Sequence, residues 1–232
     1  DRDNGILIEE ISGRYFKGKV MLIQDPTQLR LAVTKELGTA GQRLSELVAE
    51  NGAIAGINGG GFYDPNAQGN GAFPEGITVL DGQIIHNSLG MKRANIIGFN
   101  SKGRLILKEL SVSQIESEDI QHAVSFIPNL ILQGQPQISG DGGWGLAPRT
   151  GIGQKADGTV ILVVIDGRIP GWSAGATLRD LMNVFIEYGA ENAANLDGGS
   201  STEMIYNGQI INRLWNVFGE RYIPTAFIVM PR

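Results

Sequence analysis

Short apolar runs that end at glycine-containing turns recur along this sequence. Glycine occupies 33 of its 232 positions, about twice its usual share of a protein. The glycines follow no three-residue period, so a collagen-like chain is excluded and many tight turns are indicated. Hydrophobic residues make up 42% of the chain and charged residues 19%, which is enough apolar material to build a packed core.

The composition excludes several classes of chemistry. The chain has no cysteine and only two histidines, His86 and His122, so thiol catalysis, iron–sulfur clusters and three-histidine metal sites are ruled out. A net charge of −5 gives no reason to expect a nucleic-acid partner. No apolar run in the sequence is long enough to span a membrane. Because the sequence opens at Asp1 rather than Met, we interpret it as a processed or trimmed chain.

Most of the apolar runs have the length and flanking residues of β-strands. Runs separated by Asp81-Gly82, Asp157-Gly158 or Asn207-Gly208 predict β-hairpins. Two segments, 43–51 and 177–188, have the i, i+3, i+4 spacing of amphipathic helices. Strands are expected at 6–11, 19–24, 29–34, 53–58, 76–80, 83–86, 95–100, 104–109, 151–155, 160–165, 193–196, 202–206, 209–212 and 223–230.

These elements predict the fold class. We expect an α+β fold in which a mixed, mainly antiparallel sheet system carries a few helices. No low-complexity linker divides the sequence, so a single domain over residues 1–232 is expected. An early helix, strand and Asn-Gly-Gly turn resembles a later helix, strand and Asp-Gly-Gly turn, which would place Asn58 and Asp197 at equivalent strand ends.

The segment that follows strand 193–196 is the strongest candidate site. Asp197 leaves an apolar strand and is followed by Gly198 and Gly199, then by Ser200 and Ser201. Glycines permit close approach of the backbone, and successive N–H groups can cradle an anion. The same residues also suit an ordinary turn, in which Asp acts only as a turn former. The pattern alone leaves both interpretations open.

Charged residues at other strand ends are further candidates. Asp166 and Arg168 follow strand 160–165, Arg149 opens the strand after a Gly/Pro-rich loop, and Arg221 precedes the last strand. Arginine is well suited to hold a phosphate through paired N–H groups. Each of these residues could equally be a solvated surface side chain.

Two weaker motifs are interpreted as structural. Segment 64–75 nearly matches a calcium loop, with Asp64 first and Glu75 twelfth, but Gln68 stands at the fifth position and no helices flank it. A polar loop is therefore favoured, and calcium or magnesium remains only an open alternative to a site without a cofactor. The Gly-x-Gly at 151–153 runs into a β-turn instead of a helix, which excludes a dinucleotide-binding loop.

Taken together and in order, several segments resemble the phosphodiester glycosidase family. The resemblance runs from about Leu29 to the end of the chain. An extra glycine, Gly61, precedes Phe62, and Ser200 stands where the family often has a third glycine. The matching stretches are Ile-Asn-Gly-Gly-Gly-Phe-Tyr at 57–63, Arg-Thr-Gly-Ile-Gly at 149–153, Val-Ile-Asp-Gly-Arg at 164–168, Gly-Ala-Thr-Leu at 175–178, Gly-Ala-Glu-Asn-Ala at 189–193 and Asn-Leu-Asp-Gly-Gly-Ser-Ser at 195–201.

The resemblance implies hydrolysis of a sugar-1-phosphodiester, of the N-acetylglucosamine type, at the bond between the anomeric carbon and oxygen. Such a bond breaks through an oxocarbenium-like transition state, and its phosphate leaving group needs little protonation. A carboxylate near the anomeric carbon is needed, and Asp197 is the candidate nucleophile or stabiliser. Asp166 is the expected partner carboxylate, as base for water, and Glu75 is a reserve acid or base.

Positive charge for the departing phosphate is the second requirement. Arg149 is the first candidate, and Arg168 and Arg221 are the second candidates. Asn58 is expected to position the substrate. The backbone of Gly198, Gly199, Ser200 and Ser201 is expected to contribute N–H groups.

The same resemblance implies a cellular location and a substrate, and two other functions remain open as alternatives. A bacterial protein exported to the cell surface or beyond is expected, with an upstream signal or anchor, a glycan phosphodiester substrate and a role in exopolysaccharide or cell-envelope carbohydrate metabolism. One alternative is a domain that binds phosphate-linked glycans without cleaving them. Another is a metal-dependent phosphodiesterase that cleaves the P–O bond.

Overall fold

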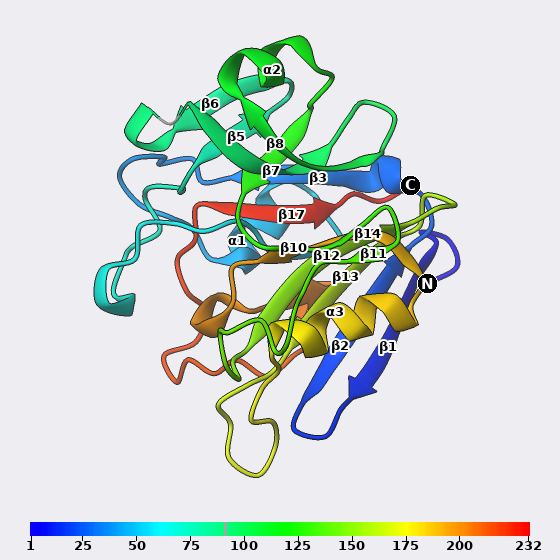
Figure 1. Cartoon of the computed structure of the whole chain (residues 1–232). Coiled ribbons are helices and arrows are strands. Elements are labelled where there is room, and N and C mark those ends of the chain that lie inside the picture. The colour runs from blue at the N-terminus through cyan, green and yellow to red at the C-terminus, as the bar shows by residue number, and fades with distance from the viewer. Residues whose placement is uncertain (91) are drawn as a thin grey trace.

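The computed structural model describes residues 1–90 and 92–232 and arranges their strands in three sheets (Figure 1). Every strand pairing among these residues is antiparallel. The seven-stranded sheet has the order β1 (Ile6–Ser12), β2 (Lys17–Ile23), β13 (Val160–Ile165), β12 (Arg149–Lys155), β14 (Ala190–Leu196), β10 (Asn129–Leu132) and β11 (Gln135–Pro136). One five-stranded sheet has the order β16 (Gln209–Ile210), β15 (Met204–Tyr206), β4 (Ala55–Asn58), β17 (Thr225–Val229) and β3 (Leu29–Val33). The other has the order β6 (Gln83–Asn87), β5 (Ile77–Leu80), β9 (His122–Ser125), β7 (Arg93–Phe99) and β8 (Leu105–Ser111).

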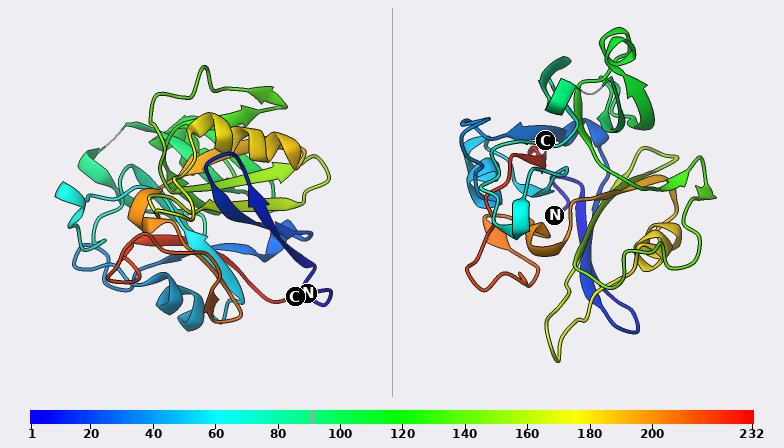
Figure 2. Two further views of the ribbon diagram at one scale, coloured as in Figure 1. Left: turned by 90° about the horizontal axis from the view of Figure 1, so that it is seen from below. Right: turned by 60° about the vertical axis from the view of Figure 1, so that its left-hand side comes forward.

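Helix α3 (Leu178–Glu187) covers one face of the seven-stranded sheet (Figures 1 and 2). Thr177 caps it, because its side chain accepts a hydrogen bond from Asp180 N. Phe185 packs directly onto β12, where a Cβ at Gly151 or Gly153 would lie 2.7 or 2.8 Å from the Phe185 ring. These two glycines therefore let the helix approach the sheet, and this explains the Gly-x-Gly pattern without a nucleotide.

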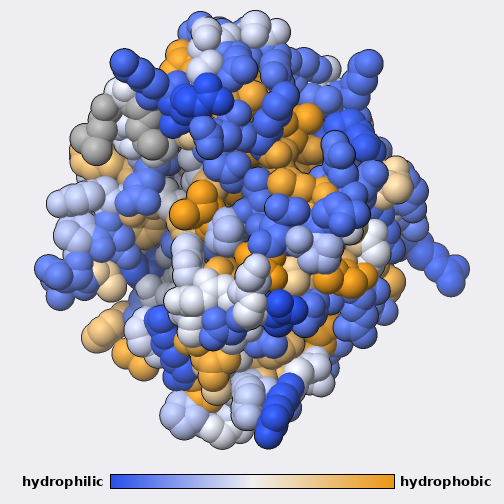
Figure 3. Space-filling model, viewed as in Figure 1, coloured by the Kyte–Doolittle hydropathy of each residue, from blue (hydrophilic) through white to orange (hydrophobic). Residues whose placement is uncertain are grey.

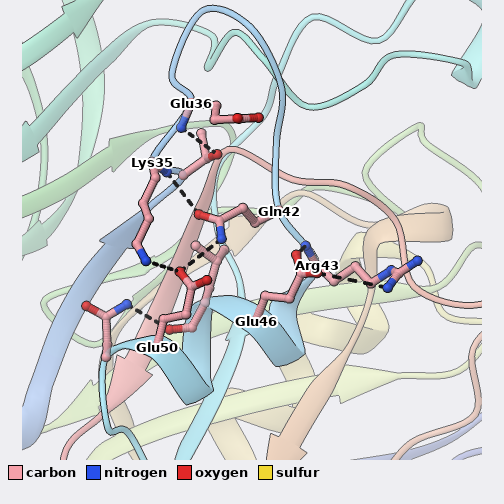
Figure 4. Close-up of polar contacts among 9 residues, drawn as sticks. Lys35, Glu36, Gln42, Arg43, Glu46 and Glu50 are labelled. Carbon is pink, nitrogen blue, oxygen red and sulfur yellow. Dashed lines mark hydrogen bonds and ion pairs between the residues drawn. The ribbon is translucent and has the colours of Figure 1, made fainter.

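Helix α1 (Leu44–Glu50) covers the first five-stranded sheet with its apolar side, and its polar side is tied to the preceding loop (Figure 4). Glu46 accepts a hydrogen bond from Arg43 N at 3.0 Å, which caps the first turn. Glu50 accepts from Gln42 Nε2 and pairs with Lys35 Nζ, both at 3.0 Å. Exposed ion pairs of this kind contribute little to the free energy of folding. The apolar face of α1 therefore contributes most to holding the helix on the sheet.

One apolar cluster joins the three sheets. It includes Leu162 from the seven-stranded sheet, Ile57 and Phe227 from the first five-stranded sheet, and Ile97 and Phe99 from the other. The Phe99 and Phe227 rings meet edge to face with centroids 6.1 Å apart. The predicted fold class, antiparallel sheets with a few helices, is confirmed.

The elements that the sequence did not predict are short. They are α2 (Val112–Ser117), β9, β10 and β11. Helix α2 has six residues and buries only Ile115, so it shows no periodic apolar pattern. Strands β9 and β10 have four residues each, too few for alternation to be recognised.

The surface is mainly polar. On the face drawn in Figure 3, hydrophilic residues predominate and smaller hydrophobic patches lie between them. In the part of the chain that the structure describes, no helix is both long and apolar enough to cross a membrane.

Candidate active site

Three neighbouring strands of the seven-stranded sheet deliver candidate residues at the same end. Arg149 of β12 pairs with Ile165 of β13, and Thr150 pairs with Leu196 of β14. Asp166 and Asp197 therefore follow strands on either side of Arg149. Since adjacent strands lie about 4.8 Å apart, the Asp166 and Asp197 backbones are separated by roughly 10 Å. The prediction that these strand ends gather in one region agrees with this register.

The Asp197 turn is clamped to the neighbouring sheet. Asp197 N donates to Gly59 O at 3.2 Å, and Asn58 Nδ2 donates to Asp197 O at 2.6 Å. Asn58 Oδ1 in turn accepts from Thr150 Oγ1 at 2.8 Å. Asn58 is only 1% exposed, so its side chain holds the Asp197 turn from inside the protein. The expectation that Asn58 contacts substrate stays a prediction, and the structure shows its buried amide engaged by Asp197 O and Thr150 Oγ1.

The Asp197 carboxyl group has an unusual pKa. Burial raises the pKa of Asp197 to about 7, against hydrogen bonds from Ser201 and Gly198 N that lower it. The negative charge of Asp64 raises this pKa further, and the positive charge of Arg221 lowers it. A carboxyl with a pKa near neutrality can exchange its proton under ordinary conditions, as groups in acid–base catalysis do.

Arg149 is a buried cation with no carboxylate partner. It is 5% exposed, and its Nε donates to Ala176 O at 2.9 Å while Nη2 donates to Gly145 O at 2.6 Å. Burial, and then the positive charge of Arg168, lowers the pKa of the Arg149 guanidinium. Among residues 1–90 and 92–232, neither arginine forms an ion pair. The charge of Asp180 acts against this lowering of the Arg149 pKa but forms no ion pair with Arg149 among these residues. Two neighbouring cations without an ion-paired carboxylate create a region that favours an anion.

Arg168 is the exposed member of this pair. Its Nη1 lies 3.6 Å from the position that a Cβ on Gly199 would take, so its guanidinium reaches the Asp197 turn. Its Cζ lies 4.7 Å from the centroid of the Trp215 ring. The backbone of Arg168 adopts φ +55°, which is uncommon for a residue with a side chain. Such a conformation is retained where the surrounding structure fixes it, often at functional sites.

Arg221 also contacts the Asp197 turn, at Ser200. Its Nη1 donates to Ser200 Oγ and its Nη2 pairs with Asp64 Oδ1, both at 2.7 Å. Asp64 Oδ1 also accepts from Gly69 N at 2.7 Å. The positive charge of Arg221 is thus already compensated by a carboxylate, which leaves it less available to an anionic ligand than Arg168.

Asp166 is held by its own surroundings. It is 4% exposed, and Trp172 Nε1 donates to its Oδ2 at 2.8 Å. Its Oδ1 accepts from Arg213 N at 3.1 Å and from Asn212 Nδ2 at 3.3 Å. Burial raises the pKa of Asp166, against these hydrogen bonds. Both oxygens are engaged, so the structure favours a role in holding two loops over the expected role as base for water.

Glu75 stands apart from these arginines but beside the Asn58 turn. Its N donates to Gly61 O at 2.9 Å, and its exposed carboxylate has Oε2 3.0 Å from the position of a Cβ on Gly61. Phe126 lines the same place and meets the Trp144 ring edge to face, with centroids 6.2 Å apart. No contact joins Glu75 to Asp197 within the described ranges. Glu75 remains a candidate because its carboxylate is exposed.

The calcium-loop pattern is used differently in the structure. Asp64, its first residue, is neutralised by Arg221, and the loop begins with a 3-10 turn at Pro65–Ala67. Throughout residues 1–90 and 92–232, no three His, Cys, Asp or Glu side chains gather as metal ligands would. Asp64, the first position of the calcium pattern, is engaged by Arg221 and by Gly69 N instead.

Sequence reasoning missed two aromatic residues of this site. Trp144 and Trp215 are 46% and 40% exposed, and the ring of Trp144 lies 6.0 Å from Arg149 Cζ. Each tryptophan thus stands beside one of the two unpaired arginines. Trp144 follows Gly142 and Gly143 in an irregular loop, so the available signal was a large aromatic residue where no core element was expected.

The fold of this chain is similar to that of solved structures. The chain resembles the catalytic domain of zebrafish N-acetylglucosamine-1-phosphodiester alpha-N-acetylglucosaminidase, with a TM-score of 0.78 and 22% identity over 98% of this chain and 82% of that one. A Burkholderia pseudomallei protein named "Putative exported protein" has a TM-score of 0.72 and 18% identity, over 93% of this chain and 74% of that one. These likenesses show the fold.

Sequence comparison gives the family. The SPbeta prophage-derived uncharacterized protein YomE of Bacillus subtilis is 26% identical over 165 residues, which are 67% of this chain and 26% of that protein. The present chain thus spans about a quarter of the length of this curated relative. The model of the phosphodiester glycosidase family matches residues 51–230, the range that holds Asn58, Arg149, Asp166, Arg168 and Asp197. The chain belongs to the phosphodiester glycosidase family.

Proposed function

We propose that the protein is a glycosidase that hydrolyses a sugar-1-phosphodiester, of the N-acetylglucosamine-1-phosphodiester type, at the anomeric C–O bond. The observation that carries the proposal is the placement of Arg168, an unpaired cation, beside the turn that holds Asp197. A carboxylate next to an anion-binding region is the arrangement that a bond between an anomeric carbon and a phosphate requires.

Asp197 is the proposed catalytic carboxylate. In its ionised form it stabilises or attacks the anomeric carbon as positive charge develops there. The departing phosphate monoester has a second pKa of about 6, so it leaves without needing a strong acid. Ser201 and Gly198 N orient the carboxylate by hydrogen bonds.

Arg168 is the proposed phosphate ligand, ahead of Arg149. The Nε and Nη2 groups of Arg149 donate hydrogen bonds to backbone carbonyl groups. Arg149 therefore contributes mainly positive potential and holds loop 144–147 in place. Arg221 anchors Ser200 in the turn. Asn58 and Asp166 act as positioning residues, and Glu75 is the exposed carboxylate left to activate water.

Hydrolysis in ¹⁸O-labelled water tests the bond that is cleaved. We expect the label in the released N-acetylglucosamine, since attack occurs at carbon. Label in the phosphate product would show P–O cleavage and reject the proposal in favour of a phosphodiesterase. Binding without turnover would favour a glycan-binding domain. Retention of activity in a chelator is expected because the proposed step needs only the Asp197 carboxylate and the Arg168 cation, and its loss would contradict the proposed mechanism.

We also propose that the protein acts outside the cytoplasm, at the cell surface or beyond. Its structural likeness to a Burkholderia protein named as exported supports this proposal. Recovery of the native protein in the extracellular or envelope fraction is the expected result, and recovery with cytoplasmic markers would contradict it.

A further inference from the structure

A cleft of about 550 Å³ lies beside the candidate active site, between the turn that joins β1 to β2 and the turn at 168–174. The two turns are fastened together. Tyr15 O accepts from Ala174 N at 2.8 Å, and Ser173 Oγ accepts from Lys17 N at 3.1 Å. The cleft is therefore lined by two hydrogen-bonded turns. Both turns lie at the lower end of the molecule in Figure 1.

The charges around this cleft have one sign. Arg14, Lys17 and Arg168 line it, and Arg213 lies beside its Trp172, with Cζ 3.6 Å from the ring centroid. In the described part of the chain, none of these four cations forms an ion pair. Such clustering in a chain of net charge −5 indicates a place for an anionic ligand.

The carboxylates nearest to the cleft are already engaged. Asp166 accepts hydrogen bonds from Trp172, Asn212 and Arg213 N. Glu10, on β1, pairs with Lys19 rather than with Lys17. Besides the hydrogen bond from Lys19, the charge of Lys17 lowers the pKa of Glu10, and the charge of Arg213 acts against the rise that burial causes in the pKa of Asp166. Neither carboxylate forms an ion pair with a cation of the cleft in the described part of the chain.

Aromatic rings complete the lining. Tyr15 is 52% exposed, with Arg14 Cζ 5.1 Å from its centroid, and Lys17 Nζ lies 4.2 Å from the centroid of the Trp172 ring. Rings with an apolar face and a polar edge, set among cations, suit a ligand that alternates sugar and anionic groups. A simple inorganic anion would need only the cations.

Arg168 connects the cleft to the site of cleavage. Its backbone belongs to the turn that lines the cleft, and its Nη1 reaches Gly199, two residues after Asp197. A polymer held in the cleft would therefore pass Arg168 before it meets Asp197. We propose that the cleft is a binding subsite for a repeating, polyanionic sugar–phosphate glycan, and holds the unit adjoining the bond that is cleaved. This inference rests on the proposed function and names its substrate class.

The test compares a polymer with a small substrate. The double variant Arg14→Ala/Lys17→Ala removes two exposed cations of the cleft that take no part in the Asp197 turn. The control, Lys92→Ala/Lys102→Ala, removes the same charge next to β7, on another sheet. The probes are a polymer of N-acetylglucosamine-1-phosphate repeats and a single N-acetylglucosamine-1-phosphodiester with a methyl group on the phosphate.

We expect the cleft variant to raise the Kd for the polymer about tenfold, with a weaker salt dependence. Its kcat/KM on the methyl phosphodiester should stay within about twofold of wild type, and the control variant should behave as wild type with both probes. Equal weakening by the control, an unchanged Kd in the cleft variant, or equally tight binding of heparin by the wild type would overturn the inference.

The two proposals fail in different ways. If the wild type cleaves neither probe but binds the polymer through Arg14 and Lys17, the proposed function fails and the binding subsite stands. If the wild type cleaves both probes and the cleft variant loses nothing, the glycosidase stands and the subsite is overturned.

Discussion

Asp197 differs from the other candidate carboxylates in being partly accessible while its pKa is raised to about 7. Asp166 is more deeply buried and has both oxygens engaged. The sequence identified Asp197 because a carboxylate between an apolar strand and two glycines is distinctive. It could not show that the polar atoms of Asp166 and Asn58 are buried and engaged, since burial and side-chain partners come from residues distant in the sequence.

The activity should depend on pH through Asp197. Its carboxylate form predominates only above pH 7, since burial disfavours the charge. We therefore expect kcat on a sugar-1-phosphodiester to rise about tenfold per pH unit below 7 and to level off above pH 8. Measurement between pH 5 and 9 checks this, and a rate that falls over the same range would show that the protonated acid is the working form.

Asp197→Asn should lose activity and keep its fold. We expect kcat to fall by about three orders of magnitude, because the amide neither ionises nor attacks. Removing a carboxylate that burial disfavours should also raise stability above pH 7. Kinetics paired with thermal unfolding check both, and a variant that folds and turns over at the wild-type rate would remove Asp197 from catalysis.

Glu203, which lies outside the candidate active site, also has a raised pKa and allows an independent test of how burial shifts carboxyl pKa values in this protein. Burial, and then a hydrogen bond and the charge of Glu220, raises the pKa of Glu203 to about 9. Glu220 itself is held by Ser45 N at 2.9 Å and Ser45 Oγ at 2.7 Å. Glu203 is therefore protonated in the folded protein at pH 7, whereas in the unfolded chain it ionises near its ordinary pKa of about 4.3.

Glu203→Gln should stabilise the protein at high pH. Because the folded pKa is raised, Glu203 lowers stability progressively as pH rises from about 4 to about 9. Glutamine keeps the shape and a donor to Glu220 without this cost, so we expect a gain of about 2–4 kcal/mol at pH 8 and little at pH 4. Denaturant unfolding at the two pH values checks this, with exposed Glu116→Gln as the control. An equal gain in the free energy of unfolding at pH 4 and pH 8 would contradict a raised pKa for Glu203.

The packing of α3 on β12 shows how elements set the site. Phe185 rests on Gly151 and Gly153, which brings the start of α3 to Arg149, whose Nε binds Ala176 O. The sequence predicted this helix correctly from its Thr177 cap and apolar spacing. It did not predict which strand the helix covers, because that contact depends on residues about thirty positions apart. Gly151 and Gly153 were expected in a strand, with no indication that a helix packs on them.

Gly151→Ala should destabilise the fold through a clash with the Phe185 ring. A Cβ there would lie 2.7 Å from the ring, so we expect a loss of about 1–3 kcal/mol. Phe185→Leu creates space at a cost of its own. In a double-mutant cycle from denaturant unfolding, the combined variant should lose less than the sum of the two. If the two losses of stability simply add, the Phe185 ring is not what makes a side chain at position 151 unfavourable.

The whole molecule brings Asp197, Arg149 and Arg168 together through β14, β12 and the turn after β13. The segments that form this region were predicted individually, as were most strands. Their convergence could not be read from local pattern, because it follows from the strand order β13-β12-β14. This strand order brings together chain segments that are far apart in the sequence. Trp144 and Trp215 lie in the long loops that connect such segments.

Arg168→Ala should impair phosphodiester cleavage selectively. Loss of a cation at the departing phosphate should lower kcat/KM by roughly 10²–10³, whereas a neutral aryl N-acetylglucosaminide, which carries no phosphate, should change by less than about threefold. Arg168→Lys retains the charge without paired N–H groups, so its kcat/KM on the phosphodiester should lie between those of wild type and Arg168→Ala. Equal losses on both substrates would contradict the assignment of Arg168 to the phosphate.

The most direct measurement is a crystal structure of the Asp197→Asn variant with an uncleaved N-acetylglucosamine-1-phosphodiester. The phosphate should lie within hydrogen-bond distance of Arg168, and the anomeric carbon should face the side chain at position 197. A ligand whose phosphate contacts neither Arg168 nor Arg149, or whose sugar lies away from position 197, would contradict the proposed active site.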